Sequence, residues 1–228
     1  MIKQSSNKNK QYAQARQAMI NSQIHPMGVV SEALLEAFSV VPREAFVPEN
    51  QCGICYCDED IEIAKGRYLM EPSVLARLIE ATNPQKDDVA LTIGSGIGYN
   101  AAILSHLVST VVALEEDQNL IDTAQESWDE LVCCTIACIK GELSKGAPQH
   151  APYDLIIING AVSEIPEDIK KQLNVGGRLV ALVKPAGQKV AKATLVEHIK
   201  ERCFSDRILF DAGTPYLSGF EPKKEFVF

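Results

Sequence analysis

The chain has 228 residues, 46% of them hydrophobic, and a formal net charge of −8. The length fits a single domain over residues 1–228, and the hydrophobic content excludes a disordered protein, which would hold far fewer large aliphatic residues. The negative charge disfavours nucleic acid as a partner, because lysine and arginine supply most of the affinity for a phosphate backbone.

The sequence also argues against a membrane or secreted protein. The longest apolar runs, such as 155–158 and 179–183, are far shorter than the roughly 20 residues that span a bilayer. Residues 1–10 are polar and lack the apolar stretch and cleavage site of a secretory signal. We therefore expect a cytoplasmic protein that does not contact the membrane.

Residues 1–84 are expected to form an N-terminal helical and substrate-side region. Apolar residues recur at helical intervals over residues 12–37 and are interrupted at residues 25–28, which predicts two helices with a break. The prolines within residues 41–48 predict an irregular connection. A short extended piece is expected at residues 58–65, and a helix at residues 72–81.

Residues 85–228 alternate strands with helices, which predicts an α/β core with a mostly parallel sheet and helices on both faces. The expected strands lie at residues 88–93, 110–114, 134–139, 154–158 and 178–183. The expected helices lie at residues 99–107, 119–131 and 166–173. A polar helix after residue 188, a strand at 207–210 and a terminal strand at 225–228 are expected to close the sheet.

The segment Gly94-Ser95-Gly96-Ile97-Gly98 lies between the first core strand and the helix that follows. Such a turn lets a ligand approach bare backbone beside a helix N-terminus. Its third glycine comes one residue earlier than in the dinucleotide-binding G-x-G-x-x-G pattern, which disfavours a dehydrogenase. The loop predicts a nucleoside-type ligand, although glycines in such a turn can also be purely structural.

Two acidic residues follow the next two strands at the same edge of the sheet. Glu115 has the separation from the glycines at which a carboxylate binds a ribose hydroxyl pair, and Glu142, beside Leu143, is placed to accept the amine of adenine. The alternative is that both are solvated loop charges. Two acids and no basic residue around the loop favour a cationic ligand such as S-adenosylmethionine. Gly96→Val and Glu115→Ala are each expected to lose cofactor affinity while the fold persists.

The seven cysteines form an odd number and predict reduced thiols. Cys52, Cys55 and Cys57 resemble half of a metal site, but a second C-x-x-C pair is missing. The cysteines at 133, 134 and 138 lie in an apolar stretch, where free cysteine often acts as a small core residue. We therefore predict no metal.

Several segments resemble the protein-L-isoaspartate O-methyltransferase family, in the family's order. They are residues 15–24, the V-P-R-E-A-F-V-P segment at 41–48, Tyr56 with Asp58, the glycine loop through Ala102, residues 151–154, Gln172 with Leu173, and residues 176–179. The resemblance implies a Rossmann-like class I methyltransferase fold with seven strands. It also implies S-adenosylmethionine as methyl donor and a methyl ester formed on isoaspartyl residues of damaged proteins.

The chain departs from the family at the G-Q-T-I-S-Q-P signature, which lines the family's active site. Here the segment is Gly66-Arg67-Tyr68-Leu69-Met70-Glu71-Pro72. The resemblance places Arg67, Tyr68, Met70 and Glu71 in the active site and Leu69 at the cofactor. Both hydroxyls of the signature are absent, and the Met70 thioether donates no strong hydrogen bond. Arg67 is expected either to grip an anionic substrate or to pair with Glu71.

Two milder departures affect the cofactor site: Thr92 replaces an acid before the glycine loop, and Glu142 replaces an aspartate.

Three functions stay open. The chain is a protein-carboxyl methyltransferase, a methyltransferase of the same fold with another acceptor, or a noncatalytic cofactor-binding module. The expected partner is a peptide or protein with an exposed carboxylate, or a small anionic acceptor. The oligomeric state is not predicted.

Overall fold

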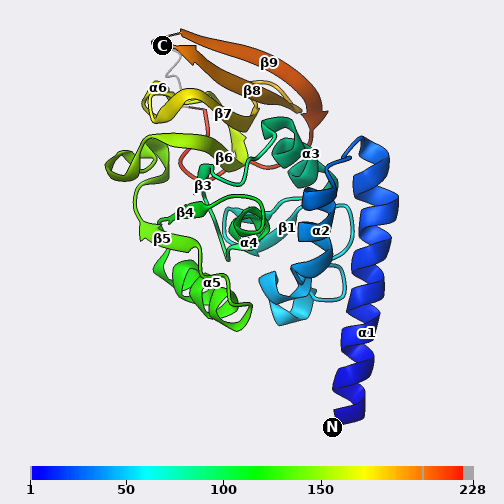
Figure 1. Ribbon diagram of the computed structural model, residues 1–228. Coiled ribbons are helices and arrows are strands. Elements are labelled where there is room, and N and C mark those ends of the chain that lie inside the picture. The colour runs from blue at the N-terminus through cyan, green and yellow to red at the C-terminus, as the bar shows by residue number, and fades with distance from the viewer. Residues whose placement is uncertain (1, 202, 223–228) are drawn as a thin grey trace.

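The computed structural model describes residues 2–201 and 203–222, and a seven-stranded sheet runs through its centre (Figure 1). The strand order is β5-β4-β3-β6-β7-β8-β9. The strands are β3 (Val89–Ile93), β4 (Thr110–Glu115), β5 (Ile136–Lys140), β6 (Tyr153–Val162), β7 (Leu173–Val183), β8 (Ala191–Lys200) and β9 (Cys203–Ala212). The strand expected at 225–228 lies outside the described residues.

Strands β3 to β7 pair in parallel, and β8 and β9 add an antiparallel hairpin. The helices α4 (Tyr99–Ser105) and α5 (Gln118–Glu130) connect β3 to β4 and β4 to β5, and the short α6 (Glu167–Lys170) precedes β7. The order in which strands are added to the sheet reverses at β3, because β4 and β5 lie on one side of it and β6 and β7 on the other. In open parallel sheets, ligands bind at the carboxyl edge beside such a point.

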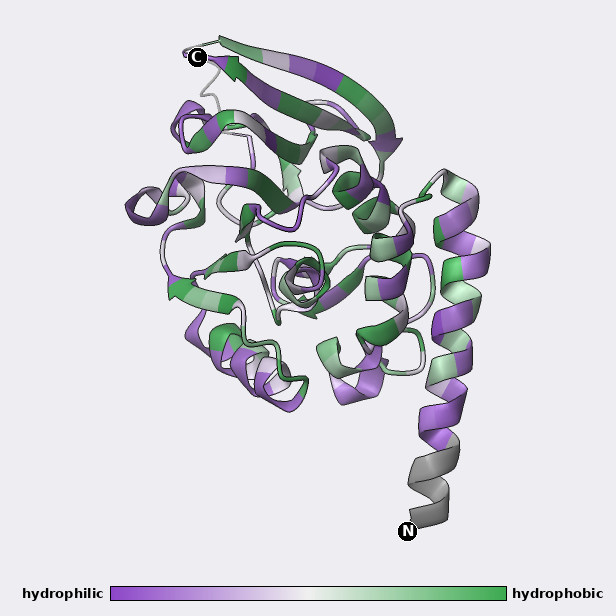
Figure 2. Cartoon of the chain, in the orientation of Figure 1, coloured by the Kyte–Doolittle hydropathy of each residue, from purple (hydrophilic) through white to green (hydrophobic). Residues whose placement is uncertain are grey.

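Alternate residues of the central strands enter two separate hydrophobic cores, because successive side chains point to opposite faces. Ala90 and Val111 pack with α2 (Glu32–Val40), α3 (Pro72–Thr82), α4 and α5 on one face. Leu91 and Val112 pack with α6 and the last described residues on the other face. Figure 2 shows these strands as predominantly hydrophobic. The predicted mostly parallel α/β sheet with helices on both faces is confirmed.

The N-terminal region contains the two predicted helices with their break. Helix α1 (Ile2–Met19) continues through a π-helical turn and a 3₁₀ turn to Gly28, whose φ of 88° ends the helix before α2 begins. The extended piece expected at 58–65 is one arm of a hairpin, in which β1 (Ile61–Ala64) pairs with β2 (Arg67–Leu69). None of the helices over residues 2–201 and 203–222 is both long and apolar enough to cross a membrane.

Several residues of the family-like segments hold these elements together. The Arg16 guanidinium donates to the Tyr56 hydroxyl at 2.9 Å and to Glu44 Oε1 at 3.0 Å, which ties α1 to the body of the protein. Asp58 Oδ1 accepts from the backbone N–H of Ser73 at 3.0 Å, in the first turn of α3. These contacts fix where the β1–β2 hairpin enters and leaves the site.

The polar helix predicted after residue 188 is wrong, because residues 191–200 form strand β8. Alanine, lysine, leucine and glutamate favour a helix there, but Thr194, Val196 and Ile199 are β-branched, and both edges of the segment pair with neighbouring strands. The helix predicted at 166–173 is only four residues long, because the chain enters β7 at Leu173.

Candidate active site

The glycine loop lies at the carboxyl end of β3, where the chain bends into α4. The backbone φ angles of Gly94, Gly96 and Gly98 are 70°, 57° and 91°, values that favour glycine. The N–H groups of Gly94 and Ser95 both donate to the Leu114 carbonyl, at 3.0 and 3.1 Å, so the loop is held against the end of β4. This geometry places the loop at the carboxyl edge of the sheet.

Side chains already occupy the space above these glycines. A Cβ added at Gly94 would lie 2.7 Å from Leu217 Cδ1, and one added at Gly96 would lie 2.8 Å from Ile63 Cδ1. At Gly98 the Trp128 ring would lie 2.4 Å away. The glycines are therefore required by close packing within the protein as well as by their φ angles.

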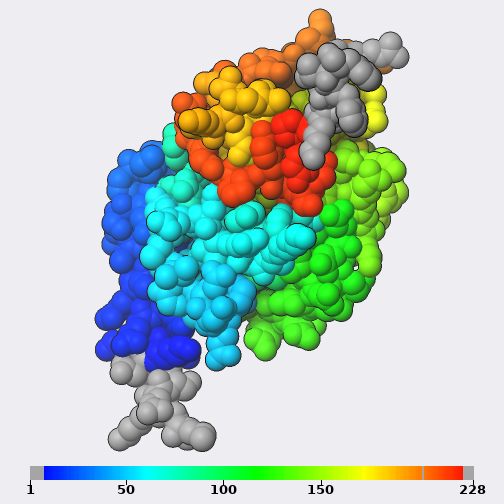
Figure 3. Space-filling view, turned by 180° about the vertical axis from the view of Figure 1, so that it is seen from behind, coloured from blue at the N-terminus to red at the C-terminus, as the bar shows by residue number. Residues whose placement is uncertain are grey.

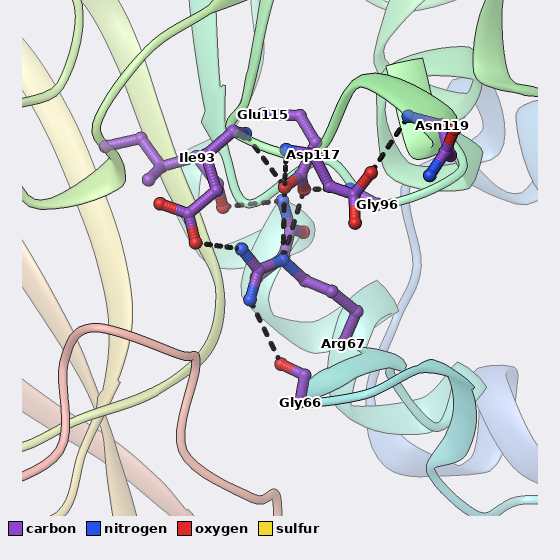
Figure 4. A network of polar contacts seen from close by, with 9 residues as sticks. Gly66, Arg67, Ile93, Gly96, Glu115, Asp117 and Asn119 are labelled. Atoms are coloured by element: carbon purple, nitrogen blue, oxygen red, sulfur yellow. Dashed lines mark hydrogen bonds and ion pairs between the residues drawn. The ribbon is translucent and has the colours of Figure 1, made fainter. Parts of the chain in front are cut away.

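Glu115 lies fully buried at the end of β4, in the network drawn in Figure 4. Its carboxylate accepts from the backbone N–H groups of Gly96 and Glu116, both at 2.9 Å, and of Asp117 at 3.3 Å. The Arg67 Nε–H also donates to it, at 3.2 Å to Oε1 and 3.3 Å to Oε2. Glu115 is thus a structural anchor of the loop.

Arg67 lies in a different place from either position that the sequence predicts. It reaches from β2 to the end of β4, where its guanidinium donates to Glu115 and also to Glu116 Oε1 at 2.6 Å. A further N–H of the guanidinium donates to the Gly66 carbonyl at 3.2 Å. It pairs with Glu115 and Glu116 and not with Glu71, and the expectation that no basic residue lies near the loop is wrong. The sequence alone does not indicate this ion pair, because 48 residues separate Arg67 from Glu115.

A cavity of only about 20 Å³ lies between the loop and the hairpin. Its walls are formed by three groups of residues. They are the signature positions Tyr68, Leu69 and Met70, the loop residues Gly94, Ser95, Ile97 and Gly98, and the neighbouring residues Ile63, Leu75, Tyr99, Asn100 and Asn159. Pockets for small ligands are usually about 300–1,000 Å³. The structure thus brings Tyr68, Leu69 and Met70 to the glycine loop, but around a small space.

Three residues that line this cavity carry a polar atom without a hydrogen-bond partner. Ser95 Oγ, the Tyr99 hydroxyl and Asn100 Oδ1 are buried and unpaired within the described residues, which is unusual because buried polar groups are normally satisfied. Asn100 Nδ2 does bond, to Asn159 Oδ1 at 2.6 Å and to Thr92 Oγ1 at 3.2 Å. Thr92 therefore anchors a neutral amide network where the family has an acid. The unpaired acceptors suit the ammonium group of a ligand at the loop.

Glu142 and Leu143 are placed apart from this cavity. The Glu142 carboxylate is exposed, pairs with Lys145 Nζ at 2.6 Å and accepts from Ser144 Oγ at 2.7 Å. The hydrogen bond from Lys145 is the main cause of a lowered Glu142 pKa. Leu143 is buried in the second hydrophobic core. Glu142 thus has the position of an exposed loop charge, as the alternative reading of the sequence expects.

Arg43 was not among the predicted site residues, although it lies within the V-P-R segment. It is fully buried, and its guanidinium donates to the carbonyls of Cys55 at 2.6 Å and Met70 at 2.7 Å. It also lies over the Tyr99 ring, 5.0 Å from the centroid. Arg43 therefore positions the backbone of the signature segment. A sequence indicates such a role only where a charged residue interrupts an otherwise apolar segment.

The cysteines show no metal-binding arrangement. Over residues 2–201 and 203–222, no group of three or more potential ligands is gathered at one point. Burial raises the pKa of Cys55 to about 12, which disfavours the thiolate that a metal requires.

Glu71 precedes α3, beside the acidic residues Asp58, Glu59 and Asp60. Burial, and then the charges of these neighbours, raise the pKa of its carboxyl to about 7. The ordinary value is about 4.3, so between the two values the folded state binds the proton more tightly than the unfolded state. This contribution to stability is present below about pH 4.3 and is lost as the pH rises through about 7.

Glu71→Gln, which keeps the side-chain size, is expected to raise the free energy of unfolding at pH 8 by about 1 kcal/mol, a value reduced for the partial exposure of the carboxyl. At pH 5 the gain is expected to be much smaller. Urea unfolding at the two pH values measures both, with Glu36→Gln on the exposed side of α2 as the control. An equal gain at pH 5 and pH 8 would contradict the raised pKa.

Comparison with known families assigns the chain. The sequence profile described as protein-L-isoaspartate(D-aspartate) O-methyltransferase matches residues 14–206. The chain belongs to this family. A protein-L-isoaspartate O-methyltransferase from Methanoculleus marisnigri is 36% identical over 170 residues, which cover 75% of this chain and 77% of the relative. One from Rhodopseudomonas palustris is 34% identical over 203 residues, which cover 89% and 93%.

Solved structures agree with this assignment of the fold. A protein-L-isoaspartate O-methyltransferase superposes with a TM-score of 0.77 at 25% identity, covering 90% of this chain and 66% of the other. A Plasmodium falciparum chain described as a member of the family, in complex with S-adenosyl-L-homocysteine, superposes with a TM-score of 0.75 at 17% identity, covering 91% and 98%. The expected seven-stranded methyltransferase fold is therefore confirmed.

The segment that resembles the family's signature lies at the small cavity. The threonine and serine hydroxyls of the protein-L-isoaspartate O-methyltransferases are replaced by Tyr68 and Met70, and both side chains line the small cavity. Met70 is almost fully buried there.

Proposed function

We propose that this protein is an S-adenosylmethionine-dependent methyltransferase that esterifies the side-chain carboxylate of isoaspartyl residues in damaged proteins. The observation that carries the proposal is the meeting of the glycine loop, buried Glu115 and the signature positions Tyr68 to Met70 around one point at the carboxyl edge of the sheet. Membership of the protein-L-isoaspartate O-methyltransferase family supports both the donor and the acceptor.

The donor set of the loop fits the cofactor chemically. We assign the ribose hydroxyls to the Glu115 carboxylate, and the ammonium group to the unpaired acceptors of Ser95 and Asn100. The backbone of Gly94, Gly96 and Gly98 allows the close approach. Glu142 and Leu143 follow β5 at the same edge of the sheet, and we assign them to adenine. To bind adenine, the Glu142 carboxylate must give up its ion pair with Lys145. Leu69 completes the wall on the hairpin side.

The bound cofactor supplies a methyl group on a sulfonium, from which a carboxylate oxygen takes the methyl while the carbon–sulfur bond breaks. This in-line displacement neutralises opposite charges and needs no strong base, so the task of the protein is to position the carboxylate and exclude water. Tyr68 and Met70 enclose the acceptor side, and Arg43 fixes the backbone that carries them. Glu71 flanks this segment as a positioning residue.

A paired peptide assay tests the proposal. Methyl transfer from labelled S-adenosylmethionine is expected for a peptide that contains isoaspartate and not for its aspartyl twin. Equal transfer to both peptides, or to neither, would contradict the assignment of the acceptor.

A second candidate is a methyltransferase with a different, small anionic acceptor. It is favoured by Met70, whose thioether cannot donate a hydrogen bond to an isoaspartyl carboxylate as the signature serine would, and by Tyr68, whose ring is bulkier than the signature threonine. It predicts turnover with a small carboxylic acid where the isoaspartyl peptide gives none. A noncatalytic module is the third candidate, and it predicts cofactor binding without transfer to any acceptor.

We also propose a cytoplasmic location for the enzyme. Support comes from the seven cysteines, which all lie within the described residues and are all free thiols. Free thiols persist in a reducing compartment. The proposed partner is a peptide or protein with an exposed carboxylate.

A further inference from the structure

The carboxylate assigned to the cofactor ribose has no free position in this structure. Of the four donors to Glu115, three are backbone N–H groups, from Gly96, Glu116 and Asp117. The turn after β4 fixes these three. The fourth donor is the Arg67 side chain, which is attached to the β1–β2 hairpin. A ribose hydroxyl pair can therefore reach Glu115 only where Arg67 now lies.

Arg67 has a second partner that allows it to leave. Its terminal nitrogen bonds Glu116 Oε1 at 2.6 Å, and the Glu116 side chain is 44% exposed. The guanidinium can therefore keep one carboxylate partner while it moves from the buried Glu115 toward the surface. Bonds of this charge-assisted kind contribute more than neutral hydrogen bonds, so their exchange affects ligand affinity.

The rest of the cofactor space is filled by the same hairpin and by residues 214–220, which we call the strap. Figure 3 shows this segment against the hairpin on the back of the molecule. Leu217 of the strap lies over Gly94, and Ile63 of the hairpin lies over Gly96. A Cβ added at Gly66 would lie 3.5 Å from Ser218 Cβ, so hairpin and strap are in contact.

Backbone bonds hold the strap to the end of β6 and not to the hairpin. The Ala161 N–H donates to the Pro215 carbonyl at 2.9 Å, and the Leu217 N–H donates to the Ala161 carbonyl at 2.8 Å. By contrast, the hairpin is joined to its surroundings through side chains: Arg67 bonds Glu115 and Glu116 at the end of β4, and the Gln51 amide donates to the Glu62 carbonyl at 2.8 Å. The hairpin is therefore the part that can move at the smaller loss of hydrogen bonds.

We propose that Arg67 is an internal competitor of the methyl donor, whose guanidinium holds Glu115 and closes the β1–β2 hairpin over the glycine loop until a ribose displaces it. Cofactor affinity is then set by Arg67, a residue for which the family signature has glutamine. The inference rests on the proposed function, because it takes S-adenosylmethionine as the ligand of the loop.

Calorimetric titration of the full chain with S-adenosylhomocysteine tests the proposal. Arg67→Gln removes the competing cation and is expected to bind about tenfold or more tightly than the parent, since a hydrogen bond to a charged group is lost only from the unliganded state. Arg67→Lys keeps a cation and is expected to stay near the parent affinity. Arg77→Gln, an arginine over the Phe210 ring, is the matched control and is expected to change nothing.

Two further measurements distinguish a failure of the role proposed for Arg67 from a failure of the proposed function. Leu217→Ala opens the same space without touching Glu115 and is expected to tighten binding as well. In hydrogen exchange of the parent, S-adenosylhomocysteine is expected to speed exchange in residues 62–69. Parent binding with an unchanged or weaker affinity of Arg67→Gln would overturn the role of Arg67 and leave the proposed function standing. Absence of binding by the parent and by every variant would overturn both.

Discussion

Glu115→Ala is expected to abolish S-adenosylhomocysteine binding and to lower the free energy of unfolding by about 3–5 kcal/mol. The carboxylate is fully buried and accepts from Gly96, Glu116, Asp117 and Arg67. Its removal takes the buried carboxylate away from the Arg67 guanidinium and leaves the Gly96 N–H without its acceptor. Urea unfolding and calorimetric titration measure the two effects.

This expectation differs from the one that the sequence gives, in which the fold persists after Glu115→Ala. The difference comes from burial, because a solvated carboxylate at a loop would stabilise little. Glu116→Ala is the matched control: it removes an exposed partner of the same arginine and is expected to cost less than about 1 kcal/mol. A Glu115→Ala protein as stable as the Glu116→Ala protein would contradict the anchoring role.

Met70→Ser is expected to raise kcat/KM for an isoaspartyl peptide by about tenfold or more. The serine restores a hydroxyl of the family signature at a position that lines the cavity, and a hydrogen bond to a charged group contributes about 1.5–3 kcal/mol. The same change is expected to lower the free energy of unfolding by at least about 2 kcal/mol, because Met70 is almost fully buried. Methyl transfer and urea unfolding measure the two effects.

The control is Met27→Ser, because Met27 is 48% exposed on the 3₁₀ turn before α2. It is expected to change neither activity nor stability appreciably. A folded Met70→Ser protein with parental activity would mean that the signature hydroxyl does not control the acceptor here. Tyr68→Thr combined with Met70→Ser then tests whether both hydroxyls are required together.

The core of the fold was predictable because its signals are local. Strand β3, the glycine loop and α4 follow one another within 17 residues, and each has its own pattern of apolar residues or glycines. The same is true of β4 and Glu115. By contrast, residues 191–200 contain helix-favouring residues, and their strand forms only through pairing with β7 and β9. Pairing with other strands cannot be predicted from the residues of one segment.

The site was predictable in position but not in its contacts. The alternation of strands and helices predicts that Gly94 to Gly98 and Glu115 meet at one edge. It does not predict that Arg67 crosses from the hairpin to Glu115, because the pairing depends on how the β1–β2 hairpin lies over the loop. Nor does it predict that Glu142 pairs with Lys145, one 3₁₀ turn away.

Methyl transfer by the unmodified protein tests the central claim most directly. Purified protein is incubated with labelled S-adenosylmethionine and either an isoaspartyl peptide or its aspartyl twin, and base-labile methyl esters are counted. Esters are expected on the isoaspartyl peptide alone, with transfer inhibited by S-adenosylhomocysteine. Cofactor binding without any ester on the isoaspartyl peptide would contradict the proposed activity.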